Sequence, residues 1–289
     1  MDNFSFIGYD GRLYCHLHIA THCNYRCSYC YPKLEVNQQP MWRPEEQRFI
    51  ADKINSIERV KQIVISGLGE ITLTPGFLDL IHGLVATRFS LVTNLSATNE
   101  YFMRMPLNTI FDCSFHPEHT TPEDFAEKVF ALSEKYVVKP RIILTENNRK
   151  SVLRLLKLLP TSDRIQPRVL YDYSSKNTAG DLVPNEPVYE RDGVPENKDL
   201  SVRNNNFHGM YCNVPNSTLI VSPDRTVTSC IHDKRRAASM YTFDFSKLNN
   251  VRAPMRCDKL KCSPCNLKDA KFKNITDCFQ YAQEHFDRG

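Results

Sequence analysis

Apolar and polar residues alternate with two different periods along the first 170 residues of the chain. Six segments have the period-two alternation or short apolar run that is typical of β-strands, and they span residues 13–20, 60–66, 89–94, 110–115, 140–145 and 165–170. Between them apolar residues recur every three or four positions, as in Ile50, Ile54 and Ile57, which is typical of amphipathic helices. Strands that alternate with helices pair in parallel, and right-handed crossovers curl such a sheet. The pattern therefore predicts an α/β fold with a partial barrel of parallel strands.

Two Thr-Pro pairs predict where helices begin. Thr74 and Pro75 precede an apolar series that starts at Phe77, and Thr121 and Pro122 precede one that starts at Phe125. A threonine hydroxyl can cap a helix, and proline is favoured at the first helical position. We therefore expect both threonines to be N-caps.

Strand alternation sorts the side chains of the first and fourth strands into two faces. The apolar face, expected against the helices, carries Leu13, Cys15, Leu17, Ile19, Phe111, Cys113 and Phe115. The face expected toward the barrel interior carries Tyr14, His16, His18, Ala20, Asp112, Ser114 and His116. Since active sites of βα barrels lie at the carboxyl ends of strands, His16, His18 and His116 are candidate catalytic residues. Cys15 and Cys113 are expected to be packed thiols.

The composition changes after Tyr171. Residues 172–210 are rich in Asp, Asn, Glu, Pro and Lys and have no sustained period, which is typical of a linker or lid. An alternating run at 217–222, a Pro-Asp-Arg turn and a second run at 226–229 then predict a β-hairpin. We expect three parts: a barrel core at 1–171, a linker at 172–210 and a small hairpin-plus-helix module at 211–289.

Net charge, apolar runs and cysteine content argue against a nucleic-acid-binding, membrane-spanning or secreted protein. The chain has 289 residues, 41% of them hydrophobic, and a net charge of only +4, with no basic stripe that would favour nucleic acid. No apolar run reaches the roughly 18 residues that a membrane span needs, and no secretion signal is recognised. Eleven cysteines in such a chain favour reduced metal ligands over disulfides, so we expect a cytoplasmic protein.

Three of these cysteines lie within eight residues after the first predicted strand. Cys23, Cys27 and Cys30 have the spacing Cys-x3-Cys-x2-Cys. Three thiolates on a short loop can hold one face of a [4Fe-4S] cluster and leave one iron without a protein ligand. A zinc site or a redox pair is the alternative, but structural zinc prefers four closed ligands.

This triplet resembles the cluster loop of the radical S-adenosylmethionine (SAM) enzymes, in which an aromatic residue, here Tyr29, commonly precedes the third cysteine. Ser66-Gly67-Leu68-Gly69-Glu70 is similar to the Gly-Gly-Glu segment with which the family holds the SAM amino group. The resemblance implies a (β/α)6 partial barrel of the TIM type. It also makes Asn94 and Ser114, at the ends of the third and fourth strands, candidates for contacts to the SAM ribose or carboxylate. The alternative is that these two side chains only hydrogen-bond loop backbone.

A second cysteine set lies near the end of the chain. Its members, Cys212, Cys230, Cys262 and Cys265, resemble the Twitch module, a short relative of the SPASM domain, in which four thiolates hold an auxiliary [4Fe-4S] cluster. A zinc knuckle is the alternative. Cys257 could be a ligand, a packed thiol or a hydrogen-atom donor. Cys278 shares a helical face with Phe279, and we expect it to be packed.

The radical SAM resemblance implies a reaction and its partners. SAM bound at the open iron would be cleaved by one electron to a 5'-deoxyadenosyl radical that abstracts a substrate hydrogen atom, with flavodoxin or ferredoxin as electron donor. Related enzymes oxidise, crosslink or epimerise ribosomally made peptides, or act on aminocyclitols and aminosugars. Only 22 residues precede Cys23, fewer than a leader-peptide domain needs, although that domain can be a separate protein. We expect a peptide substrate, with an aminocyclitol or other carbohydrate as the alternative and a non-catalytic metal scaffold as the alternative of another class.

Overall fold

A computed structural model describes residues 13–30, 36–144, 146–171, 211–212, 218–230, 237–250, 255–256 and 271–272. The linker at 172–210, Cys257, Cys262, Cys265 and Cys278 lie outside these ranges.

The core of the fold is one nine-stranded sheet with the order β10-β9-β8-β1-β2-β3-β4-β5-β6. Its strands are β1 (Leu13–Ala20), β2 (Val60–Gly67), β3 (Arg88–Thr93), β4 (Thr109–Phe115), β5 (Val137–Leu144), β6 (Arg168–Tyr171), β8 (Thr218–Val221), β9 (Thr226–Thr228) and β10 (Ala238–Ser239). The strands from β8 to β6 are parallel to their neighbours, whereas β9 and β10 pair antiparallel. The six predicted strands are confirmed with small shifts at their ends. Within the described residues the sheet does not close, so the barrel is partial.

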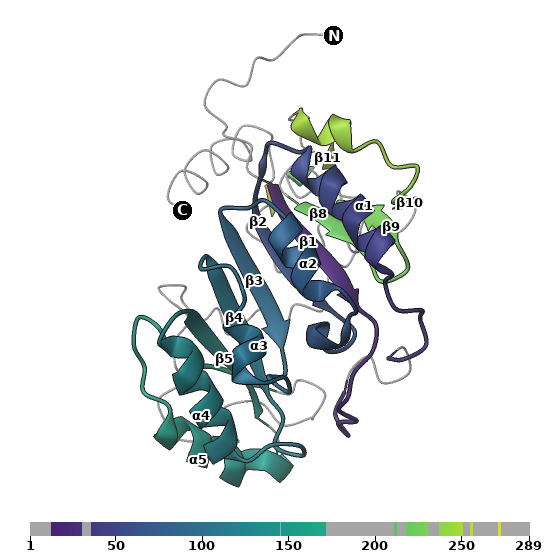
Figure 1. Ribbon diagram of the computed structural model, residues 1–289. Coiled ribbons are helices and arrows are strands. Elements are labelled where there is room, and N and C mark those ends of the chain that lie inside the picture. The colour runs from purple at the N-terminus through teal and green to yellow at the C-terminus, as the bar shows by residue number, and fades with distance from the viewer. Residues whose placement is uncertain are drawn as a thin grey trace.

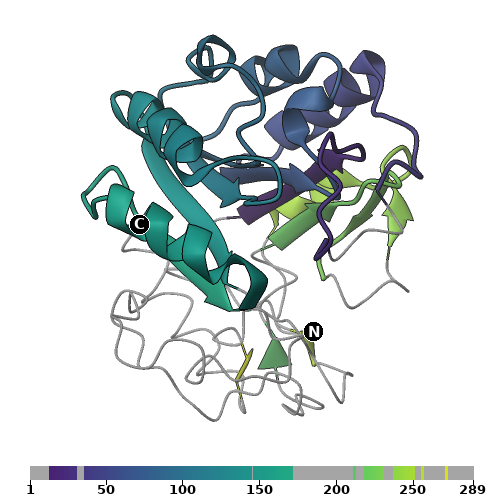
Figure 2. The same cartoon turned by 90° about the horizontal axis from the view of Figure 1, so that it is seen from below.

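Among the described residues, five α-helices lie on one face of this sheet (Figures 1 and 2). They are α1 (Pro44–Asn55), α2 (Phe77–Gly83), α3 (Asn99–Phe102), α4 (Pro122–Ser133) and α5 (Arg149–Leu158). Short 3-10 helices occur at Ile71–Leu73, Glu146–Asn148 and Phe245–Asn249. The face of β1 and β4 that was predicted to be apolar is buried beneath the helices, with Cys15 and Cys113 both fully buried. Burial raises the pKa of the Cys15 thiol to about 12, as expected for a packed thiol.

One of the two predicted helix caps is confirmed and the other is wrong. Thr121 caps α4, and its hydroxyl accepts a hydrogen bond from the Asp124 backbone at 3.1 Å. Thr74 does not cap α2, which begins at Phe77 after Gly76 in a left-handed conformation with φ 76°. The reason is that a 3-10 helix precedes it, and Thr74 is the residue that ends this 3-10 helix.

The predicted hairpin is confirmed, and it extends the barrel sheet. β8 pairs with β9 around the turn, and β8 also lies parallel to β1, with Cys15 opposite Leu219. A second sheet joins β7 (Tyr211–Cys212) to β11 (Met255–Arg256) and β12 (Lys271–Phe272). The three-part division of the chain remains a prediction. None of the helices among the described residues is long and apolar enough to span a membrane.

Candidate active site

The cysteine triplet lies on the loop that follows β1, at the edge where the parallel strands end. The Cys23 backbone nitrogen donates to the Asn37 side chain at 3.1 Å, and the Tyr25 backbone nitrogen approaches the Cys23 sulfur at 3.4 Å. Burial raises the pKa of the Cys27 thiol to about 11, with smaller contributions from Glu118 and from the charges of Cys23 and Cys30. The Cys30 backbone nitrogen donates to the Cys27 carbonyl at 3.3 Å, so the second and third cysteines of the triplet lie on one turn.

The glycine segment after β2 lies directly against this loop. The Leu68 backbone nitrogen donates to the Ala20 carbonyl at 2.7 Å, and the Glu70 backbone nitrogen donates to the His22 carbonyl at 2.8 Å. A Cβ atom on Gly67 or Gly69 would collide with the Ala20 or His22 backbone. The two glycines are thus required for backbone packing against the root of the cysteine loop.

The Glu70 carboxylate is buried, and both of its oxygens accept hydrogen bonds from the protein. Oε1 accepts from the Thr72 backbone at 3.1 Å and from the Thr93 hydroxyl at 2.8 Å, and Oε2 accepts from the Asn94 backbone at 2.6 Å. The Thr72 hydroxyl adds a further bond at 2.9 Å. Burial raises the pKa of this carboxyl although these hydrogen bonds oppose the shift. Glu70 therefore joins the ends of β2 and β3, and its contact with the SAM ammonium remains a prediction.

The end of β3 brings Asn94 to the cysteine loop. Its side-chain nitrogen lies 3.1 Å from Asn24 Oδ1 and 3.9 Å from the Cys23 sulfur. The next residue, Leu95, is buried in a left-handed conformation with φ 56°, which is strained for a residue with a branched side chain. Lys128 donates to the Leu95 carbonyl at 2.6 Å and helps to hold this backbone.

The loop after β4 forms the other wall of the site. His116 Nδ1 lies 3.3 Å from the Cys27 sulfur and 3.0 Å from the Tyr29 hydroxyl. Glu118 accepts hydrogen bonds from the Ser28 backbone, at 2.8 Å, and from the Ser28 hydroxyl. Burial lowers the pKa of His116 to about 4, so this ring is neutral at pH 7. Of the three predicted site histidines, His116 is the one in contact with a predicted ligand.

The sequence analysis did not single out Glu118 and His119, which also belong to this wall. The rings of His119 and Tyr25 stack with centroids 4.3 Å apart, and His119 Nε2 accepts from the Arg26 backbone at 3.3 Å. One ligand atom each from Cys27, Glu118 and His119 lie within 4.8 Å of one another. The available signal was the run His116-Pro117-Glu118-His119, which places three polar side chains directly after a predicted strand.

The remaining inward-facing residues line the sheet away from the helices. The rings of His16 and His18 lie 6.2 Å apart, and burial together with the charge of His16 lowers the pKa of His18 to about 4. Asp112 accepts from Arg141 at 3.0 Å and from the Ser90 hydroxyl at 3.1 Å. Ser114 is half-buried on β4. Catalytic roles for His16 and His18, and a SAM contact for Ser114, remain predictions.

The second cysteine set is described only in part. Cys230 follows β9, and the backbone of Cys212 pairs with Met255 on one side and Lys271 on the other. Lys271 follows Cys262 and Cys265 in the chain, and Met255 precedes Cys257. The pairing therefore anchors both ends of the segment that carries these cysteines to the strand of Cys212.

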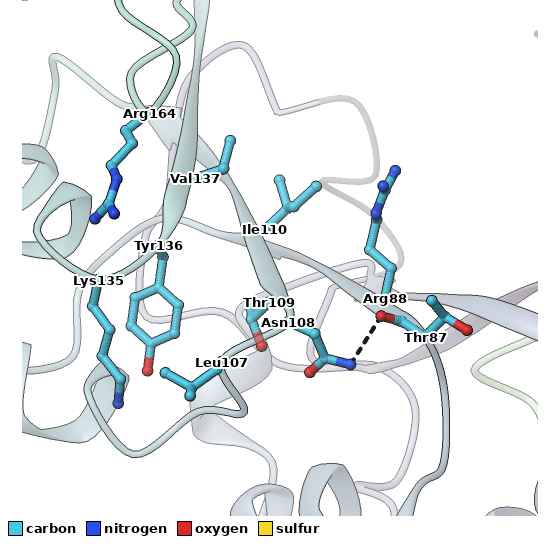
Figure 3. A pocket seen from close by; sticks show the side chains of 10 residues that line it. All are labelled: Thr87, Arg88, Leu107, Asn108, Thr109, Ile110, Lys135, Tyr136, Val137 and Arg164. Atoms are coloured by element: carbon cyan, nitrogen blue, oxygen red, sulfur yellow. Dashed lines mark hydrogen bonds between the residues drawn. The ribbon is translucent and has the colours of Figure 1, made fainter. Parts of the chain in front are cut away.

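A separate hollow of about 310 Å³ lies at the opposite edge of the sheet, where β3, β4 and β5 begin (Figure 3). Its lining residues include Arg88, Thr109 and Val137, and Asn108 donates to the Thr87 carbonyl there at 3.1 Å. Because active sites of parallel βα folds lie at the carboxyl ends of the strands, this hollow lies at the opposite edge of the sheet from the candidate active site.

Comparison with known proteins gives the fold. No protein-family model and no curated protein matches the sequence. A solved structure of anSMEcpe with bound AdoMet and Cp18Cys peptide is similar with a TM-score of 0.54 at 15% identity, over 96% of this chain and 97% of that one. Streptococcus suis SuiB is similar with a TM-score of 0.51 at 10% identity, and the match spans 83% of this chain but only 66% of SuiB. BtrN in complex with AdoMet and 2-DOIA has a lower TM-score of 0.40 at 15% identity. At such low identities these likenesses show the fold alone: a mostly parallel α/β sheet that forms a partial barrel, as in anSMEcpe and SuiB.

Proposed function

We propose that this chain is a radical SAM enzyme that modifies a peptide. The observation that carries the proposal is the gathering of Cys23, Cys27 and Cys30 on one loop at the carboxyl edge of a partial barrel, packed against a glycine segment from β2. The donor set fits a [4Fe-4S] cluster, because three thiols supply three of its four ligands and leave one iron open. A cluster and SAM bound here would supply one-electron reductive cleavage of SAM, with the electron from a flavodoxin- or ferredoxin-type donor, and hence abstraction of a hydrogen atom from the substrate.

The protein's own residues position and shield this chemistry. Glu70 and Asn94 hold the ends of β2 and β3 against the cysteine loop, and His116 and Tyr29 meet beside Cys27. Gly67, Leu68, Gly69 and Glu70 are the proposed contacts for the SAM amino group, and Asn94 and Ser114 for its ribose or carboxylate. The sheet face that carries His16, His18 and Asp112 is proposed to face the substrate and to exclude water from the radical.

A peptide is the first substrate to test, because the similar solved structures with TM-scores above 0.5 include anSMEcpe with bound peptides. An aminocyclitol remains the alternative. An enzyme that acts on a peptide and one that acts on an aminocyclitol would both begin by cleaving SAM. The substrate is therefore tested separately from SAM cleavage.

The first experiment is anaerobic reconstitution of the full chain with iron and sulfide. We expect about eight irons in two [4Fe-4S] clusters, the second held by Cys212, Cys230, Cys262 and Cys265. Changing Cys23, Cys27 and Cys30 together to alanine should halve the iron and abolish 5'-deoxyadenosine formation, while the buried control Cys113→Ala should keep both. SAM cleavage that persists in the triple variant would refute the assignment.

The second experiment identifies the class of reaction. Synthetic peptides and aminocyclitols are compared for stimulation of 5'-deoxyadenosine formation in deuterated water, and the products are weighed. A product lighter by two hydrogens indicates oxidation, and carbon-bound deuterium that disappears in Cys257→Ala indicates epimerisation. Stimulation by aminocyclitols alone would transfer the proposal to the carbohydrate alternative.

A further inference from the structure

The loop after β4 contacts the cysteine loop at several independent points. Glu118 accepts from Ser28, His119 accepts from the Arg26 backbone, and Tyr25 stacks on His119. These contacts join segments that are about 90 residues apart in the chain. They determine where the loop lies relative to β4, and they bring one ring nitrogen to one predicted ligand sulfur.

His116 is that ring, and its orientation is held from two sides. The Tyr29 ring lies parallel to it, with an interplanar angle of 7° and centroids 6.1 Å apart, and the Tyr25 ring meets it edge-on at 5.6 Å. His116 Nδ1 lies 3.3 Å from the Cys27 sulfur, within reach of a hydrogen bond to sulfur. The Tyr29 hydroxyl lies 3.0 Å from the same ring nitrogen, so a hydroxyl and an imidazole meet beside this sulfur.

The direction of the hydrogen bond follows from the chemistry of the sulfur. A cysteine that binds iron is a thiolate, which carries no proton and can only accept. A ring nitrogen 3.3 Å from a thiolate is attracted to it only if that nitrogen carries a proton, which assigns N–H to Nδ1. The Tyr29 hydroxyl, 3.0 Å from the same nitrogen, can then only accept from it. Hydrogen bonds to the sulfurs of an iron-sulfur cluster change its reduction potential, because they stabilise the extra negative charge of the reduced state.

We propose that His116 is a positioning residue that donates Nδ1–H to the Cys27 sulfur and thereby raises the reduction potential of the SAM-binding cluster. The inference rests on the proposed function, since it requires a cluster on Cys27. It gives the protein a means of making the first cluster easier to reduce, through a side chain that is not itself a ligand.

The test is an EPR-monitored redox titration of the reconstituted protein, following the cluster whose signal changes when SAM is added. His116→Phe should shift the midpoint potential to a more negative value. His116→Asn should keep the wild-type midpoint, because its side-chain nitrogen occupies nearly the position of Nδ1. His22→Phe is the control: this histidine is on the cysteine loop, its ring nitrogen contacts the Thr21 hydroxyl at 2.9 Å, and its replacement should leave the potential unchanged.

An unchanged midpoint in His116→Phe would overturn the inference, and so would a shift in His116→Asn as large as that in His116→Phe. If His116→Phe assembles no cluster, the wild-type protein labelled with [15N]histidine decides. Pulsed EPR should then detect a histidine nitrogen weakly coupled to the reduced cluster, and its absence would overturn the inference. A wild-type protein that takes up no iron would instead refute the proposed function.

Discussion

At the scale of single residues, Glu70 is both a buried carboxylate that braces the fold and a proposed contact for SAM. A buried carboxylate is costly unless its oxygens accept hydrogen bonds, and Glu70 accepts them from Thr72, Thr93 and Asn94. We predict that Glu70→Ala lowers the free energy of unfolding of the cluster-free protein by about 3 kcal/mol, because several buried donors lose their acceptor. Urea denaturation without SAM measures this loss.

The exposed Glu127 provides the control, since Glu127→Ala should change stability by less than about 0.5 kcal/mol. If Glu70→Ala were as stable as the wild type and only SAM affinity fell, the carboxylate would be a ligand contact and not a brace between β2 and β3.

At the scale of elements, the segment after β2 packs closely against the segment after β1, because its glycines have no side chains. A Cβ atom at Gly69 would meet the His22 carbonyl, which directly precedes Cys23. We predict that Gly69→Ala displaces the cysteine loop, lowers the iron bound on reconstitution and costs about 1 to 3 kcal/mol of stability. Iron analysis and denaturation of the same preparation measure both effects.

Gly83, at the end of α2, is the matched control, because a Cβ atom added there would have no other atom within 4 Å. Gly83→Ala should retain full iron and gain up to about 1 kcal/mol from improved helix propensity. Equal iron in the two variants would show that the close approach at Gly69 does not position the cysteine loop.

At the scale of the whole molecule, the hairpin is tied to the amino-terminal half of the chain by Arg225. This residue turns the hairpin with φ 65° and donates to both Glu46 oxygens, at 3.2 and 3.1 Å, while its guanidinium lies 5.2 Å from the centre of the Trp42 ring. Although burial opposes it, the hydrogen bonds from Arg225 hold the pKa of Glu46 below its usual value. We predict that Arg225→Ala lowers the free energy of unfolding by about 3 kcal/mol, since the buried Glu46 carboxylate loses its half-buried ionic partner and keeps only the Tyr241 hydroxyl and Arg43.

Arg43 contacts the same carboxylate from an exposed position at 3.7 Å, so Arg43→Ala should cost less than about 1 kcal/mol. Thermal and urea unfolding of both variants make the comparison. Equal losses would mean that burial does not distinguish the two pairs.

Stability should also depend on pH through the inward face of β1. The pKa of His18 is lowered from 6.5 to about 4 in the folded protein, so between these values the unfolded chain binds the additional proton. Stability contributed by the neutral ring is therefore present above pH 6.5 and is lost as the pH falls toward 4. We predict that His18→Gln reduces the decline in unfolding free energy between about pH 6.5 and 4.5 by roughly 2 kcal/mol. Denaturation of the cluster-free protein across this range measures the slope. A slope unchanged in His18→Gln would contradict the burial argument.

The sequence by itself determined the elements and the proposed chemistry. Period-two runs predicted β1 to β6, the face of β1 that carries Cys15 is buried as alternation requires, and Thr121 caps α4 as its Thr-Pro pair predicted. These features depend on local propensity and on the two side-chain periods, which are read within ten or fifteen residues. The cysteine spacing, likewise local, directed the proposal toward an iron-sulfur cluster.

Only the tertiary structure decided which distant segments meet. Thr74 failed as a cap because the neighbouring 3-10 helix took its place, and β8 joined β1 although about 200 residues separate them in the chain. The contact of His116 with Cys27 and the closure of Glu70 onto Asn94 were likewise absent from any local pattern. The physical reason is that such contacts depend on strand order and on the burial of whole faces, and neither is encoded within a single turn or strand.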